Sequence, residues 1–159
     1  MKLRCWQLKN PTLATLAFLA LVTPSVAEDR WQSGFGQGIH EAYVEKGPGN
    51  QIYVACTAGA ARPSTSISFM LAGDGPPDNS LVTLTFDNET PFDIGVGEHG
   101  VLRSDCHACA ASFDYVLERL KTRQSVHVRF EDGLSTTFPL ADASTSIGDE
   151  CTADFWEAY

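Results

Sequence analysis

Two cysteines separated by two residues form the motif whose spacing most directly suggests chemistry. Cys106 and Cys109, with His107 and Ala108 between them, have the spacing of thiol–disulfide oxidoreductases, and a helix is predicted to begin beside them. A thiolate is favoured at a helix N-terminus, where the first amide groups are unpaired and carry partial positive charge. The flanking βαβ pattern of such enzymes is missing, so redox catalysis using Cys106 and Cys109 is the second alternative and not the leading interpretation.

Zinc binding is the other chemistry that these residues allow. Cys106, His107 and Cys109, with His99 or Cys151 as a fourth ligand, are of the types that zinc prefers. A second C-x-x-C pair is absent, and disulfides explain the cysteines without a metal, so we predict neither a metal site nor a cofactor. The sequence has no nucleotide-binding glycine loop, zinc-protease motif or nucleophile elbow, and we predict that the protein is not an enzyme.

The N-terminal residues have the pattern of a cleaved export signal. A basic start precedes an apolar run at 13–22, and Ser25, Val26 and Ala27 supply small residues for cleavage. The run is shorter than the roughly 20 residues needed to cross a bilayer, so no membrane span is predicted. We therefore expect a signal peptide at 1–27, a single β-rich domain at 28–159, and a periplasmic or secreted location.

Four cysteines lie in the predicted mature chain, Cys56, Cys106, Cys109 and Cys151, while Cys5 leaves with the signal. In an oxidising compartment this even set indicates two disulfides, each stabilising the fold by roughly 2–4 kcal/mol. We expect Cys56 and Cys151 each to join one member of the 106/109 pair, which would pin both distant segments to the helix start. The alternative pairs Cys106 with Cys109 and Cys56 with Cys151.

The elements that must hold these cysteines are mostly strands, because apolar and polar residues alternate along much of the chain. Residues 39–45 and 51–57 are expected to pair through the turn between them, and Asp132-Gly133 signals a second hairpin. The glycine-rich stretch 34–38 is expected to be a flexible lead-in. Further strands are predicted at 67–71, 81–86, 92–96, 126–130 and 134–140.

One amphipathic helix is predicted at about 110–121, where apolar residues recur at helical spacing from Cys109 through Phe113 to Leu120. The tail beyond residue 141 is expected to be irregular, tethered by Cys151 and docked through Phe155, Trp156 and Tyr159. Six to eight antiparallel strands with one helix predict a mainly β fold, a small β-sandwich or barrel stabilised by disulfides.

The predicted mature chain is strongly acidic. All 20 acidic residues but only 8 of the 11 basic ones follow Ala27, which leaves a net charge of −12. Such a charge repels nucleic acid and anionic lipid and attracts cationic proteins. We therefore predict a basic protein partner and no nucleic acid. The expected contact loops are 73–79, 87–89 and 97–100, and their candidate partner-binding residues are Asp74, Asp78, Asp87, Glu89, Glu98 and His99.

The segment from Cys106 to Cys151 resembles small disulfide-containing periplasmic proteins of proteobacteria, including the invasion-associated locus B group. The similarity lies in the C-x-x-C, the helix around 113–120, the 126–130 strand, Phe138-Pro139-Leu140 and the closing cysteine. It implies an exported β-domain of the cell envelope without known chemistry. Lysozyme inhibitors and periplasmic immunity proteins are similar in size, export and charge.

The leading hypothesis is therefore an exported, non-enzymatic binding or inhibitory module that neutralises a basic wall-degrading enzyme or toxin, as an immunity protein does. Its acidic surface would accelerate the encounter with a cationic partner. The first alternative is an envelope structural or invasion-associated protein. The thiol oxidoreductase is the second.

Overall fold

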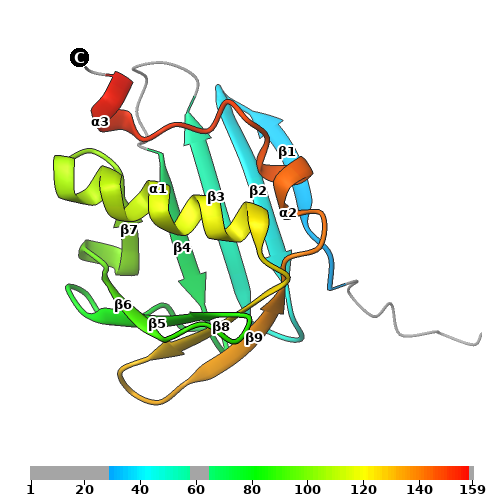
Figure 1. Ribbon diagram of the computed structural model, residues 1–159, viewed down its shortest axis with the longest axis vertical. Coiled ribbons are helices and arrows are strands. Elements are labelled where there is room, and N and C mark those ends of the chain that lie inside the picture. Colours follow the sequence, from blue (N-terminus) through cyan, green and yellow to red (C-terminus); the bar gives the residue numbers. More distant parts are fainter. Residues whose placement is uncertain (1–28, 58–64, 158–159) are drawn as a thin grey trace, which may run out of the picture.

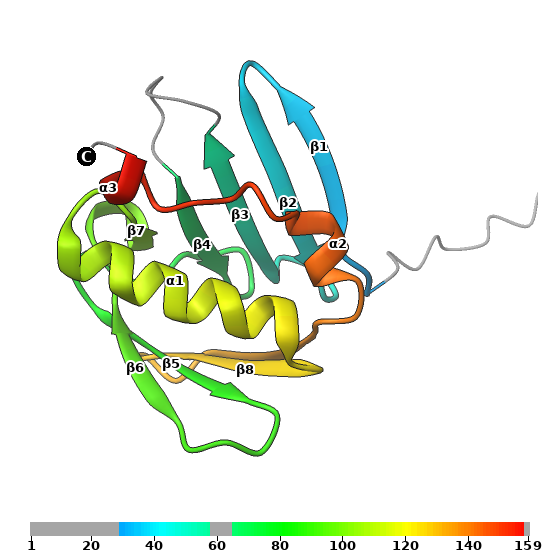
Figure 2. The same ribbon diagram turned by 45° about the horizontal axis from the view of Figure 1, so that its top comes forward.

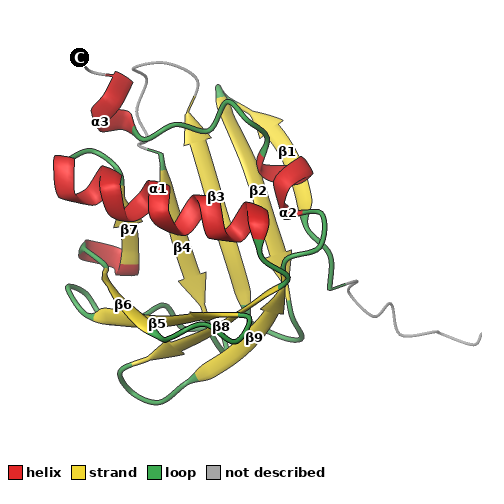
Figure 3. Cartoon of the chain, viewed as in Figure 1, coloured by secondary structure: helices red, strands yellow, loops and turns green. Residues whose placement is uncertain are grey.

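The computed structural model describes residues 29–57 and 65–157, and the predicted signal peptide with Cys5 lies outside these residues. The chain forms two antiparallel sheets and one long helix, so the fold is mainly β, as predicted. Figure 1 and Figure 3 show the helix α1 lying in front of the larger sheet and above the smaller one.

The strands are short, and the long helix lies in the sequence between the strands β1–β7 and the strands β8 and β9. The elements are β1 (Gln32–Gly36), β2 (Ile39–Glu45), β3 (Gln51–Thr57), β4 (Ser66–Met70), β5 (Leu81–Phe86), β6 (Phe92–Gly95), the 3-10 turn η1 (Glu98–Gly100), β7 (Val101–Arg103), α1 (His107–Thr122), β8 (Ser125–Phe130), β9 (Ser135–Pro139), α2 (Ala143–Ile147) and α3 (Asp154–Glu157).

The larger sheet has the strand order β1-β2-β3-β4-β7. The predicted pairing of 39–45 with 51–57 is confirmed, with a register that runs from Ile39 opposite Thr57 to Glu45 opposite Gln51. Alternate residues of β3 and β4 face the core, and Ile52, Val54 and Ile67 are fully buried. The sequence period of two thus becomes an apolar inner face and a more polar outer one.

The smaller sheet has the order β6-β5-β8-β9. The hairpin predicted at Asp132-Gly133 connects β8 to β9, and Gly133 adopts a φ of 94°, which a side chain would oppose. Pro139 is the last residue of the edge strand β9, where its missing amide hydrogen removes no bond inside the sheet.

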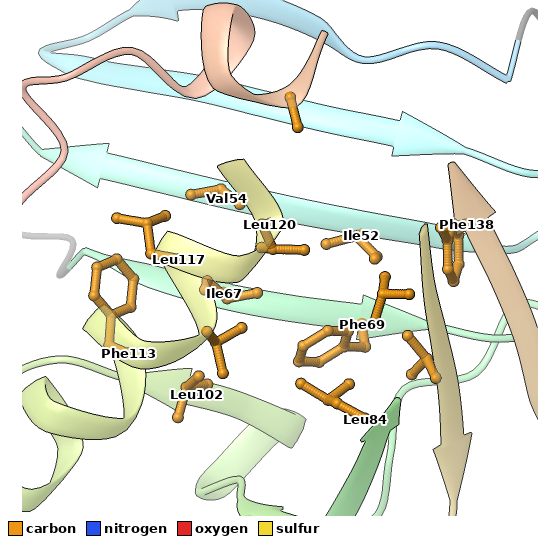
Figure 4. Packing of buried hydrophobic residues seen from close by; sticks show 14 of the residues in the cluster. Ile52, Val54, Ile67, Phe69, Leu84, Leu102, Phe113, Leu117, Leu120 and Phe138 are labelled. Atoms are coloured by element: carbon orange, nitrogen blue, oxygen red, sulfur yellow. The ribbon is translucent and has the colours of Figure 1, made fainter. Parts of the chain in front are cut away.

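Helix α1 packs its apolar stripe against the larger sheet, with the smaller sheet beneath it (Figure 2). Phe113, Leu117 and Leu120 point toward Val54 and Ile67 of the larger sheet (Figure 4). The helix spans 107–122, so the predicted range of about 110–121 was three residues short at its start and one at its end. Among residues 29–57 and 65–157, no helix is both long and apolar enough to span a membrane.

Three segments differ from the sequence prediction, which expected six to eight strands where the described residues form nine. Val101–Arg103 forms the strand β7, which was not predicted. The predicted flexible lead-in forms the edge strand β1, whose backbone pairs with β2 from Gln32 opposite Tyr43 to Gly36 opposite Ile39. Trp31 anchors this strand, because its buried ring donates a hydrogen bond from Nε1 to the Pro139 carbonyl at 3.1 Å. The tail also contains the short helices α2 and α3, and was predicted to be irregular.

Candidate functional site

The cysteines pair differently from the arrangement that we favoured. Cys56 is bonded to Cys151, and Cys106 is bonded to Cys109. The expectation that Cys56 and Cys151 each reach the 106/109 pair is therefore wrong. Cys106 and Cys109 stand at the N-cap and in the first turn of α1, where their Cα atoms are only 4.9 Å apart, so local helix geometry brings the two sulfurs together.

The tail reaches the helix start without a covalent link. The Asp154 carboxylate accepts a hydrogen bond from the Thr65 backbone N–H at 3.0 Å, and the Phe155 N–H donates to the Ser104 carbonyl at 3.0 Å. These bonds hold the tail across the ends of β3 and β4, and Cys151 then lies 5.2 Å from Cys56 between Cα atoms. Both of these cysteines are buried, at 6% and 9% exposure.

The Cys106–Cys109 disulfide lies at the surface. Cys106 is exposed and Cys109 is half-buried. As the N-cap of α1, Cys106 accepts a hydrogen bond on Sγ from the Cys109 backbone N–H at 3.1 Å. The sulfur thus takes the place that a serine or aspartate oxygen occupies in most helix caps, facing the positive end of the helix dipole.

A surface pocket of about 500 Å³ opens beside this disulfide. It lies between the first turn of α1 and the end of β6 with β7, on the side of the molecule where Figure 1 shows these elements together. At the end of β6, the backbone of Gly95 and Gly97 forms part of the pocket wall, with no side chain projecting from it. Its other lining residues include Val101, Arg103, Cys106 and Cys109.

Two charged residues, Arg103 and Asp105, line the pocket. The Arg103 guanidinium donates to the Asp105 carboxylate, with Nε to Oδ1 at 3.1 Å, and both residues line the pocket. This hydrogen bond and the charge of Asp105, together with the weaker influence of Glu98, raise the pKa of Arg103. Arg103 therefore stays positively charged. Because Asp105 and Glu98 are both acidic, the net charge of these three side chains is negative.

Aromatic rings lie against the exposed side of the helix start. His107, inside the C-x-x-C, makes edge contacts with Phe155 and Trp156, with ring centroids 5.4 and 5.5 Å apart. Trp156 donates from Nε1 to the Asp114 carboxylate at 2.7 Å, which fixes α3 on α1. The predicted docking of Phe155 and Trp156 is confirmed, while Tyr159 lies outside the described residues.

The predicted partner-binding residues divide into two groups. Asp87 accepts bonds from the Gln124 and Ser125 backbone amides, and Glu89 forms ion pairs with Arg119 at 3.4 Å and Arg123 at 2.6 Å. Both carboxylates therefore join the β5–β6 turn to the end of α1, far along the helix from the pocket.

The other group lies nearer the pocket. Asp78 accepts a bond from the His99 backbone N–H at 2.7 Å, which brings the 73–79 loop against the turn that carries Glu98 and His99. This turn leads directly into β7 and the pocket wall. Asp74 belongs to the same loop, at its exposed end beside β4.

The negative charge of the domain is largely unpaired. Six of the seven lysine and arginine side chains in the described residues form ion pairs, and they use only five of the 19 described carboxylates. Most of the acidic side chains thus keep a charge that no lysine or arginine of the described residues balances. Within that same part of the chain, no group of three or more potential metal ligands lies close enough to hold an ion.

The sequence prediction missed the pocket itself. Arg103 and Asp105 are separated by one residue just before the C-x-x-C. Their opposite charges at this spacing could have predicted the ion pair that they form. The contribution of Gly95 and Gly97 had no such signal, because it depends on how β6 approaches the helix start.

Comparisons with known proteins place the chain in a family. No curated protein matches the chain, and no solved structure matches it. The resemblance to the invasion-associated locus B group stays a prediction. A family model described as YfjT matches residues 29–147, a range that contains Cys56, both pocket cysteines and the whole of α1. The chain therefore belongs to the YfjT family.

Proposed function

We propose that the protein is an exported, acidic protein-binding module that captures a basic partner, such as a wall-degrading enzyme or toxin, over the pocket face. The observation that carries the proposal is the unpaired negative charge, since six of the seven described lysine and arginine side chains are already in ion pairs within the chain. A surface of one sign steers an oppositely charged partner and raises its association rate.

The pocket face offers the best-supported docking position. Asp78 and Glu98 lie on adjoining loops there, and the 78–79 end of the 73–79 loop is fixed to the 97–100 turn by hydrogen bonds, while Asp74 lies at the other end of the loop beside Leu71. Gly100 adds to this rigidity, because it packs against Pro76 so closely that a Cβ at position 100 would lie 2.7 Å from the proline ring. Loops fixed in this way present their charges at low entropic cost on binding.

Two exposed apolar side chains give the partner further contact area at other places on the surface. Phe35, on the edge strand β1, is 72% exposed, and Trp156, on α3 beside the pocket cysteines, is 43% exposed. Aromatic residues with apolar bodies are enriched in the energetic centres of protein interfaces. Trp156 is connected to the pocket cysteines through His107, whose ring it contacts.

The test is a binding titration against a purified lysozyme of positive charge, in low and high salt. We expect binding that weakens with salt, and Glu98→Lys should slow association by roughly threefold or more at low salt. Glu150→Lys, the same charge change on the exposed loop between α2 and α3, is the matched control and should slow association less. Binding that ignores salt, or an equal effect of the two variants, would contradict the docking position.

A further inference from the structure

We propose that the Cys106–Cys109 disulfide is a thiol–disulfide exchange site that oxidises cysteine pairs of polypeptides seated in the adjacent pocket. The geometry that carries this inference is an exposed C-x-x-C disulfide lining a 500 Å³ pocket at the N-terminus of a 16-residue helix. The activity is separate from capture of a basic partner, and either can be present without the other.

The two cysteines differ in exposure, which gives the exchange a direction. Cys106 is exposed, whereas Cys109 is half-buried under the first turn of α1. An attacking thiolate must approach along the line of the S–S bond and reaches the exposed sulfur more easily. Cys106 is thus the sulfur that forms the mixed disulfide, and Cys109 is the one that leaves.

The helix stabilises the reduced form of Cys106. The Cys109 N–H already donates to Cys106 Sγ at 3.1 Å, and a thiolate at this position would keep that bond and gain the field of the helix N-terminus. The His107 side chain, inside the motif, is held against Phe155 and Trp156 by edge contacts.

The pocket provides space for a substrate next to the reacting sulfur. A Cβ at Gly95 would meet nothing within 4 Å, and one at Gly97 would make only ordinary contacts with Arg103 and Val101. Because no side chains project from these two positions, an extended polypeptide can approach the backbone at the end of β6 closely. The partly buried Val101 offers an apolar contact, and the Arg103–Asp105 pair offers polar ones.

The exchange balances without any further reactant. A substrate thiolate attacks Cys106 Sγ, the Cys106–Cys109 bond breaks, and Cys109 leaves with the electron pair and takes up a proton. The second substrate thiolate then attacks the substrate sulfur of the mixed disulfide and releases Cys106. The substrate dithiol loses two electrons and two protons to become a disulfide, and the protein gains both as its dithiol.

Single-cysteine variants test the direction of exchange. Cys109→Ser leaves Cys106 as the only free thiol of the pair, and Cys106→Ser leaves Cys109, while Cys56–Cys151 is retained in both. Each reduced variant is mixed with oxidised glutathione or with a short unstructured peptide closed by one disulfide, and mixed-disulfide formation is followed by mass. We expect Cys109→Ser to react at least about tenfold faster than Cys106→Ser.

A third variant tests the pocket. Gly97→Leu in the Cys109→Ser background should slow the peptide reaction by roughly threefold or more and leave the glutathione reaction nearly unchanged, since only the larger substrate needs the pocket. Intact Cys56–Cys151 and a cooperative unfolding transition show that each variant is folded.

Equal rates for the two single-cysteine variants, or a Cys106 rate no higher than that of an unstructured cysteine peptide, would overturn the exchange site. An unchanged peptide rate in Gly97→Leu would overturn the role of the pocket. The lysozyme titration, repeated with Cys106→Ser and Cys109→Ser combined, keeps the two proposals apart, because capture of a basic partner should persist without either thiol.

Discussion

The two disulfides of this domain have opposite environments. Cys56–Cys151 is buried and joins residues that are 95 positions apart, whereas Cys106–Cys109 is exposed and joins residues three positions apart. A crosslink that closes a long loop removes much conformational entropy from the unfolded chain, and one that closes a short loop removes little. The first bond therefore serves the fold, while the second contributes little to stability and is accessible to thiols.

The residues around the two disulfides also differ. The tail that carries Cys151 is held in place by Asp154, which bonds to the Thr65 backbone, and by the Phe155 amide, which donates to the Ser104 carbonyl. The Cys106–Cys109 end opens into a pocket with glycines in its wall. Burial protects one bond from reductants, and the pocket admits them to the other.

The largest effect is expected when the long-range bond is removed. The Cys56→Ser, Cys151→Ser double variant should lose roughly 4–5 kcal/mol of unfolding free energy, the value expected for a loop of about 100 residues. Denaturant unfolding followed by circular dichroism measures this loss. A loss below about 2 kcal/mol would show that the tail is held mainly by its hydrogen bonds.

Removal of the local bond should cost much less. The Cys106→Ser, Cys109→Ser double variant should lose roughly 2 kcal/mol or less, because the closed loop is short and a serine at position 106 is itself a good helix N-cap. The same unfolding measurement applies. If this variant were destabilised as much as the first, the division of roles between the two bonds would fail.

The non-covalent tether of the tail should make a smaller contribution. Asp154→Ala removes the acceptor of the Thr65 N–H bond and should cost about 1–2 kcal/mol, typical of a hydrogen bond to a charged group. Glu150→Ala, in the exposed segment just before Cys151, is the control and should change stability by less than about 0.5 kcal/mol. In the background without Cys56–Cys151, the Asp154→Ala cost should change, because both restrain the same segment.

The smallest expected effect is a loss of unfolding free energy at alkaline pH, which limits the pH range in which the two disulfides can be compared. Burial, followed by the hydrogen bond and charge of Glu41, raises the pKa of Tyr53 to about 12. An unfolded tyrosine ionises near pH 10, so Tyr53 stabilises the fold fully below about pH 10, and this stability is lost as pH rises from about 10 to 12. Because the side chain is partly solvated, the change should be on the order of 1 kcal/mol.

Tyr53→Phe should abolish that alkaline slope. Tyr43→Phe is the matched control, since Tyr43 lies directly opposite on β2 and its hydroxyl bonds to the neutral Gln32 side chain. Unfolding measured at several pH values between about 9 and 12 distinguishes them. If both variants kept the slope, another group would be its source. Reactivity of the disulfides should accordingly be compared below about pH 10.

Much of the fold follows from local pattern. The 39–45 and 51–57 strands, the Asp132-Gly133 hairpin and the α1 stripe all depend on residues close in sequence, and each was predictable. The strand β1 was missed because its glycines give no alternation, and its pairing is set by β2 and by the Trp31 anchor.

The candidate site was harder to predict for a related reason. The choice between disulfide pairings depends on where the tail crosses β3 and β4, which is fixed by Asp154 and Ser104 and has no local signature. The cysteines themselves were identified correctly as a disulfide set. Their division into one buried and one exposed bond became visible only with the fold.

Site-resolved thiol labelling of the native protein tests the division between the two bonds most directly. The folded protein is equilibrated with increasing reduced glutathione near neutral pH, trapped with an alkylating reagent and mapped by peptide mass. We predict that Cys106 and Cys109 are labelled first, while Cys56 and Cys151 stay bonded and the circular dichroism spectrum is unchanged. Labelling of all four cysteines together, or of Cys56 and Cys151 first, would contradict it.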